Sequence, residues 1–156
     1  MTQHEHATHP LEKLSDAGLT LADKSQDIRR RKVVDAQGSE IGHVSSLFID
    51  KSERKVRMIE VAAGGFLGLG NRHFLLPVDA ILNVGEHEVR VTETTARVVG
   101  SPAYDPTVID APTPKHLGLF YGYYDLAPYW SSGYMYPSFP HHETPDEKRK
   151  AERLGP

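Results

Sequence analysis

The stretch Glu40–Asp50, EIGHVSSLFID, decides the fold, because its β-branched and aromatic residues predict a strand. The segment Asp35–Gly38 before it has aspartate at its start and glycine at its finish, which is typical of a tight hairpin turn. A short run, Lys32–Asp35, leads into that turn and predicts a partner strand. Together these segments predict a β-hairpin.

Three further strands are predicted downstream, over Lys55–Ala63, 73–82 and Glu88–Thr92. In the first of them the alternation of apolar residues changes phase, which predicts either a bulge or a strand covered on both faces. In the second, Pro77 cannot donate to a ladder and predicts a bend. The connections have hairpin length and no helix is long enough to cross over, so we predict a mainly β fold, a small antiparallel barrel of five or six strands over residues 24–100.

The two ends of the chain have a different character. Residues 1–23 are polar with scattered leucines that follow neither helical nor strand spacing, which predicts a flexible arm packed weakly on the domain. Residues 141–156 are highly charged and are expected to be disordered.

An aromatic and proline-rich extension is predicted over residues 101–140, which hold 7 of the chain's 11 prolines and all 7 of its tyrosines. Thr113 followed by Pro114 predicts a helix N-cap with proline in the first turn. Apolar residues then recur at helical spacing, so we expect one short helix at about 114–125.

Composition limits the classes of function. The chain has no cysteine, which excludes disulfides, thiolate catalysis and cysteine-ligated zinc. The first ten residues do not resemble a signal peptide, and no apolar run reaches the roughly 18 residues of a membrane helix. We therefore expect a cytoplasmic protein without a membrane span. The net charge of −3 argues against a protein built mainly to hold nucleic acid.

Several motifs occur in an order that resembles a PRC-barrel domain, the small barrel shared by the photosynthetic reaction centre H subunit and the ribosome maturation factor RimM. They are Asp27-Ile28-Arg29, Ile41-Gly42-His43-Val44, Ile49-Asp50, Arg57 to Val61, and Leu75 to Ala80. The aromatic extension is similar to that of free-standing bacterial proteins of this type. The resemblance implies a docking module of larger assemblies, with no catalytic residue in the barrel. One residue departs from the pattern: Arg30 stands where the family often has glycine, and arginine resists a positive φ.

The glycine-rich stretch Gly64–Asn71, GGFLGLGN, raises the possibility of a phosphate-binding loop. That motif needs a different glycine spacing and a helix after it, whereas a strand is predicted here, so we expect a hairpin connection. Phe66, Leu67 and Leu69 lie on this loop, and they either contact a partner or fold back to cap the barrel.

The basic run Arg29, Arg30, Arg31 and Lys32 has two interpretations. It is a weak candidate for contacts with RNA phosphates, because no aromatic residues alternate with these charges. The preferred interpretation is a solvated strand edge protected by charge from pairing with another sheet.

No catalytic, cofactor or metal site is predicted. The histidine groups at the two ends lie on no element that would fix their geometry, and aspartates at turns and strand ends commonly bond the backbone. The residues considered were His4, His6, His9, His141 and His142 for metals, His43 and His73 on strands, and Asp35, Asp50 and Asp79 for catalysis.

The aromatic residues of the extension offer the candidate partner-binding set Tyr129, Trp130, Tyr134 and Tyr136. They either fold back over the barrel or dock on another chain, and we expect an adhesive arm that allows self-association. The function predicted is a non-enzymatic protein-interaction or scaffolding module with a protein partner. The alternatives are an RNA-associated or ribosome-assembly factor, and an accessory protein at a membrane-bound photosynthetic or electron-transfer complex.

Overall fold

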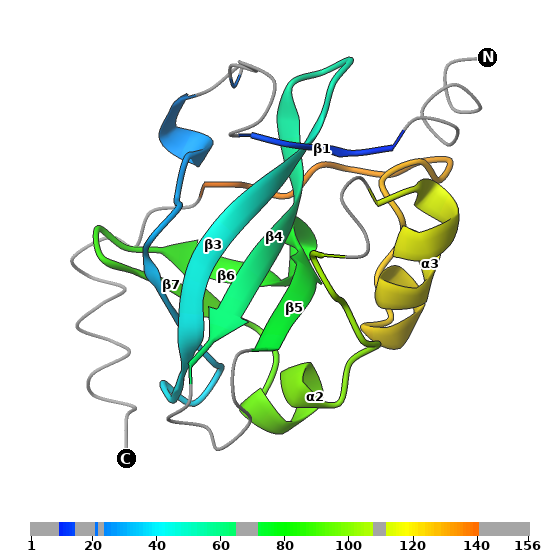
Figure 1. Ribbon diagram of the computed structural model, residues 1–156. Coiled ribbons are helices and arrows are strands. Elements are labelled where there is room, and N and C mark those ends of the chain that lie inside the picture. Colours follow the sequence, from blue (N-terminus) through cyan, green and yellow to red (C-terminus); the bar gives the residue numbers. More distant parts are fainter. Residues whose placement is uncertain (1–9, 15–20, 22–23, 65–71, 108–111, 141–156) are drawn as a thin grey trace.

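The computed structural model describes residues 10–14, 21, 24–64, 72–107 and 112–140, and its central feature is one strongly curved sheet (Figure 1). The strands follow the order β5-β4-β3-β2-β7-β6, and a two-residue strand, β1, pairs with β3 beside that path. The predictions of a mainly β barrel-like fold and of a short C-terminal helix are therefore confirmed. The elements are β1 (Glu12–Lys13), η1 (Lys24–Gln26), β2 (Lys32–Val34), β3 (Glu40–Asp50), β4 (Lys55–Ala63), β5 (Arg72–Pro77), η3 (Val78–Ala80), β6 (Ile81–Val84), β7 (Glu88–Val91), α2 (Thr95–Val99) and α3 (Pro114–Tyr123).

The sheet is mixed and not purely antiparallel, because β2 pairs with β7 in parallel. All other strand pairs in the described part of the chain are antiparallel. The difference arises at Pro77, where β5 ends and the one-turn helix η3 begins. This corner replaces a hairpin, so the chain enters β6 without pairing it to β5, and the alternation of strand directions is broken there.

The change of phase in β4 has both of the predicted causes, a bulge and the burial of both faces of the strand. The register of β3 and β4 shifts between Phe48 and Ile49, which leaves Arg57 as an extra residue on β4. Val56 and Ile59 therefore face the same core although they are three residues apart. Met58, between them, belongs to a second buried cluster on the opposite face of the sheet.

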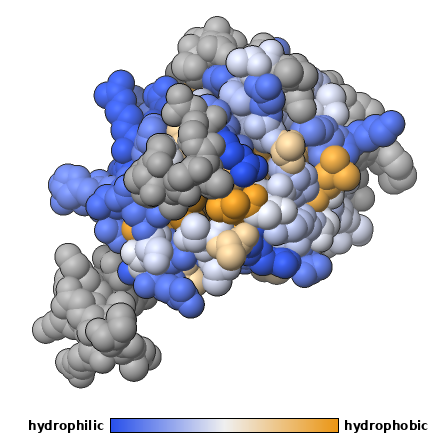
Figure 2. All heavy atoms as spheres, turned by 60° about the horizontal axis from the view of Figure 1, so that its bottom comes forward, coloured by the Kyte–Doolittle hydropathy of each residue, from blue (hydrophilic) through white to orange (hydrophobic). Residues whose placement is uncertain are grey.

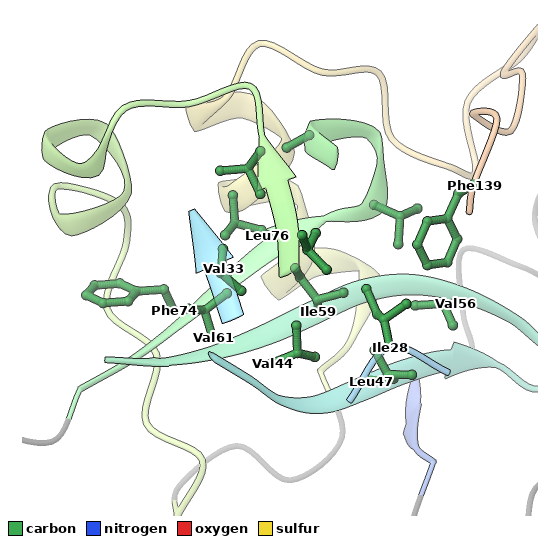
Figure 3. Packing of buried hydrophobic residues seen from close by; sticks show 14 of the residues in the cluster. Ile28, Val33, Val44, Leu47, Val56, Ile59, Val61, Phe74, Leu76 and Phe139 are labelled. Atoms are coloured by element: carbon green, nitrogen blue, oxygen red, sulfur yellow. The ribbon is translucent and has the colours of Figure 1, made fainter. Parts of the chain in front are cut away.

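The main core fills the concave side of the sheet (Figure 3). Strand residues such as Val44, Ile59 and Leu76 point into it and are completely or almost completely buried. Ile28 and Phe139 reach the same core from outside the strands, so it joins segments that lie far apart in the sequence.

The second core lies on the outer face of β3, β4 and β5 and is closed by segments from both ends of the chain. Leu11, before the barrel, packs there with Tyr104, Phe120 and Tyr129 from after it. The backbone N–H of Leu11 also donates to the carbonyl of Pro112 at 2.9 Å. The described part of the N-terminal segment, expected as a loosely packed arm, is thus packed on the barrel.

Two helices follow the strands. The helix α3 begins after Thr113, whose side chain accepts a hydrogen bond from the N–H of His116, so the predicted cap and position are confirmed. The helix α2 was not predicted, because five residues are too few to show helical periodicity. Asp35 in the first hairpin turn accepts bonds from the N–H and hydroxyl of Thr95 and thereby ties α2 to that turn.

Candidate basic groove

The second core covers one half of the outer face of the sheet, and no residue of the described ranges covers the other half. Across the open half, Lys32, His43, Ala62 and His73 lie opposite one another on four adjacent strands, as the registers show. A hollow of about 450 Å³ lies over them, which we call the basic groove. Its lining residues are Arg30, Lys32, Glu40, Gly42, His43, Ala62, Ala63, Gly64, Arg72 and His73.

The groove lies at the end of the barrel where β3 begins and β4 ends, toward the bottom of Figure 1. A space-filling view of that side of the molecule shows mainly hydrophilic side chains around a small hydrophobic area (Figure 2). Four of the lining residues are small, Gly42, Ala62, Ala63 and Gly64, so a bound group could approach the backbone closely.

Three side chains of permanent positive charge border the groove. Lys32 lies 3.5 Å from the carboxylate of Glu40, so its charge is partly offset. Arg30 and Arg72 have no carboxylate partner among the described residues. Arg72 lies over the ring of Phe74, with 5.0 Å between the guanidinium carbon and the ring centroid. Two guanidinium groups therefore remain available to an anion.

Arg30 has φ of +77°, in the left-handed region that glycine adopts most easily. This is the position at which the family pattern often has glycine, and here the arginine itself adopts the left-handed conformation. The turn is held by the N–H of Arg30, which donates to the carbonyl of Val44 at 2.7 Å. The strained arginine brings a charge to the groove that glycine would not.

Glu60 is bonded to His73, one of the side chains that line the groove, and fixes its orientation. It is buried, and its carboxylate accepts bonds from Ser45 Oγ at 2.6 Å and from Tyr104 Oη at 3.2 Å. The ring Nδ1 of His73 lies 3.0 Å from the same carboxylate. A neutral His73 consequently carries its proton on Nδ1, and its Nε2 is turned away from Glu60.

Comparison with known proteins agrees with this architecture: residues 22–98 match the family model of the PRC-barrel domain. The protein contains a PRC-barrel domain. The resemblance noted from the motifs is confirmed, and membership indicates a small domain of the general interaction type. A search of curated proteins found no match for this chain.

In the PRC-barrel domain, the four side chains of the basic run Arg29–Lys32 lie in different places and do not form one cluster. Arg29 forms an ion pair with Asp27 at 2.8 Å, and Arg31 donates to the carbonyl of Gly85 at 3.0 Å. Arg30 and Lys32 remain at the groove, where Arg72 and His73 join them from β5. The sequence did not single out Arg72, and it gave His73 only as a strand residue, because only the pairing of β4 with β5 brings the two to this place.

Residues 127–140, which we call the strap, lie on the PRC-barrel domain and do not project from it as the expected adhesive arm would. Tyr129 is buried in the second core, and Trp130 and Tyr134 pack against it. The hydroxyl of Tyr136 donates to the carbonyl of Val56 at 2.8 Å. The apolar and polar parts of these side chains are thus used within the chain, because the outer face of the sheet is itself apolar and requires cover.

Under the strap lies Arg57, the bulge residue of β4. Its guanidinium carbon lies 4.8 Å, 5.9 Å and 5.3 Å from the ring centroids of Tyr129, Tyr134 and Tyr136. Its Nη2 donates to Asp50 at 3.1 Å and to Glu53 at 2.6 Å. Burial alone would raise the pKa of Asp50, but the bonds from Ser52 and Arg57 outweigh it and hold the pKa below its ordinary value. Arg57 therefore ties the strap to the β3–β4 hairpin.

Asp79, at the corner after β5, is also held by the strap. Its carboxylate accepts a bond from the hydroxyl of Tyr134 at 2.8 Å. Burial raises the pKa of Asp79 above its ordinary value, and the bond from Tyr134 and the charge of Arg57 only partly offset that effect. Burial likewise raises the pKa of Tyr129 to about 12. Asp79 thus helps to hold the strap against the barrel.

The remaining candidates have the following places. Phe66, Leu67 and Leu69, and the terminal histidines, lie outside the described residues. The glycine-rich stretch connects two antiparallel strands, as predicted, and not a strand to a helix. Within the described ranges, no group of three or more histidines, aspartates and glutamates is placed to hold a metal ion. No helix in the same ranges is long and apolar enough to cross a bilayer.

Proposed function

We propose that the protein is a non-enzymatic docking module that holds a partner protein in the basic groove. The observation that carries this proposal is the division of the outer face of the sheet. One half is covered by the second core and the strap, whereas no described residue covers the half bordered by Arg30 and Arg72. A strand face that the described part of the chain covers along one half only, next to arginines without a described carboxylate partner, is suited to a second molecule.

An acidic segment of a protein fits the groove better than RNA does. Single-stranded RNA is usually held by aromatic side chains on which its bases stack, and among the described residues no tyrosine, phenylalanine or tryptophan lines the groove. Two guanidinium groups without a carboxylate partner in the described ranges are few for a strand of phosphates, and the protein as a whole carries a net charge of −3. We infer a protein partner whose contact segment is negatively charged.

The test compares what native affinity purification recovers with three forms of the full chain: the wild type, Arg30→Glu/Arg72→Glu, and Lys51→Glu. Lys51 is a matched control because it lies at the other end of the β3–β4 hairpin and is 69% exposed. We expect proteins that the wild type and the Lys51 variant retain, that the double variant loses, and that nuclease treatment does not release.

Two results would contradict the proposal. Equal recovery with the double variant would show that the groove holds no partner. Recovery that disappears after ribonuclease treatment would instead favour the RNA-associated alternative. Circular dichroism of the three forms establishes that each variant is folded before the comparison is made.

A further inference from the structure

Two arginines and one histidine, from two separate parts of the chain, line the basic groove. Arg30 comes from the turn before β2, and Arg72 and His73 come from the first two residues of β5. Arg30 and Arg72 have no ion-pair partner among the described residues, and Arg72 is steadied by the ring of Phe74. The groove therefore offers two guanidinium groups, each able to donate two parallel hydrogen bonds, next to lining residues with small side chains.

His73 is the most firmly oriented of the three. Glu60 holds its Nδ1, and the hydroxyls of Ser45 and Tyr104 hold Glu60 in turn. A histidine fixed in this way through a buried carboxylate presents its other nitrogen in a defined direction. The His73 side chain is 30% exposed and lines the groove, so its Nε2 is accessible to a ligand.

From these residues we propose that the basic groove recognises a phosphate monoester group carried by the docking partner. Arg30 and Arg72 would supply the positive charge, and His73 Nε2 would supply a third contact. This inference rests on the proposed function and names the chemistry of the partner. One arginine already satisfies a carboxylate through two bonds, whereas a phosphate monoester has three terminal oxygens and a charge near −2. Two guanidinium groups and an imidazole match that acceptor set.

The first experiment is an NMR titration of the ¹⁵N-labelled full chain with O-phosphoserine, with inorganic phosphate, and with glutamate at equal ionic strength. We expect saturable shifts of the Ala62 and His73 amides with the two phosphates, and much weaker shifts with glutamate. Arg30→Gln and Arg72→Gln should each weaken phosphoserine binding about tenfold, while Lys51→Gln should change it less than about twofold. Tighter binding of phosphoserine than of inorganic phosphate would indicate a phosphate borne by a partner.

The inference is overturned if the shifts do not saturate, if glutamate produces the same shifts, or if the Lys51 variant weakens binding as much as the groove variants. Tighter binding of inorganic phosphate than of phosphoserine would also overturn it, because the groove would then take the free ion.

The role of His73 has its own readout in the nitrogen shifts of its ring. Nδ1 is expected to stay protonated throughout, because Glu60 faces it, and the Nε2 signal is expected to move as phosphoserine is added. His73→Gln should weaken binding while leaving the shifts of the second core unchanged. A Nε2 signal that does not respond to saturating phosphoserine would remove His73 from the proposed contacts.

Phosphatase treatment of a captured partner separates this inference from the proposed function. Loss of capture after the treatment, together with sensitivity to Arg30→Glu/Arg72→Glu, supports both. A partner that needs the two arginines but binds equally well after phosphatase treatment contradicts the phosphate inference and leaves the docking function in place. Phosphoserine binding without any partner that depends on the arginines would contradict the docking function, and with it the claim that a partner carries the phosphate, while the phosphate-binding groove itself would stand.

Discussion

Gly42 occupies a position of β3 at which the backbone of β4 comes unusually close. A Cβ at this position would collide with the carbonyl group of Ala62. The neighbouring atoms belong to a central strand that is paired on both sides, so they cannot move away as the end of a flexible side chain would. Only glycine fits at this position, because there is no space for a Cβ atom.

We expect Gly42→Ala to lower the free energy of unfolding by about 3 kcal/mol, because overpacking displaces a paired backbone. Urea denaturation measures the effect. The matched control is Gly122→Ala in α3, where an added Cβ meets nothing within 4 Å. This control should raise stability by about 1 kcal/mol through helix propensity. Equal effects of the two substitutions would contradict the argument from space.

Arg30 provides a second prediction at this scale, because its conformation costs stability and its charge serves the groove. Arg30→Gly should relieve the positive φ and raise the free energy of unfolding by about 1 kcal/mol, while weakening anion binding. Arg30→Gln keeps the same backbone cost and should weaken binding without the gain in stability. Denaturation and the phosphoserine titration, run on both variants, separate the two effects.

Among the elements, the strap is the one whose behaviour differs most from expectation. It has no regular secondary structure, yet it is held by the buried ring of Tyr129 and by hydroxyl bonds from Tyr134 and Tyr136. Its glycine and prolines give it no periodicity, so the sequence pattern could not distinguish a segment that folds back from one that projects.

Tyr129→Ala should lower the free energy of unfolding by about 3 kcal/mol, because it removes a large ring from the second core and from the surroundings of Arg57. Met135→Ala is the control within the same segment, since Met135 is 85% exposed, and it should change stability by less than about 0.5 kcal/mol. A strap that contributed nothing to the fold would make the two variants indistinguishable in thermal denaturation.

The elements also show which features a sequence can predict. The turn at Asp35–Gly38, the corner at Pro77 and the cap of α3 depend on residues close together in the chain, and the structure confirms all three. The groove depends on strand register over long separations, and the parallel pairing of β2 with β7 depends on the direction taken after a corner. In β4, the charged Arg57 and Glu60 within an apolar run were the available signal for a polar site.

At the scale of the whole molecule, the contact between barrel and strap contains two buried carboxylates, Asp50 and Asp79. The pKa of Asp50 is below the ordinary value and that of Asp79 is above it. Asp50 has a lowered pKa, so its contribution to stability is present above the unfolded value of 3.8 and is lost as the pH falls through the folded value. Asp79 has a raised pKa, so its contribution is full below 3.8 and is lost as the pH rises through the folded value.

The substitutions Asp50→Asn and Asp79→Asn should therefore have different effects on the free energy of unfolding. At pH 7, Asp50→Asn should be less stable than the wild type, because Arg57 loses a charged partner. Asp79→Asn should be at least as stable as the wild type at pH 7, because it removes a buried charge and can still accept from Tyr134. The Asp79 difference should shrink as the pH falls from 7 toward 4, through the raised pKa of Asp79, whereas the Asp50 difference should persist to about pH 4 and shrink only below the unfolded value of 3.8; urea denaturation at these pH values measures both. The same sign for both variants would contradict the assignment.

The second core draws its residues from both sides of the segment matched to the PRC-barrel domain, and this has a consequence for how the protein is made. Leu11 leaves the ribosome first, but Phe120 and Tyr129, which pack in the same cluster, are synthesised more than a hundred residues later. At translation rates of about 5–20 residues per second, the strands are complete some seconds before the strap exists. During that interval the nascent chain carries an uncovered apolar sheet face, which is the kind of surface that a ribosome-associated chaperone would shield.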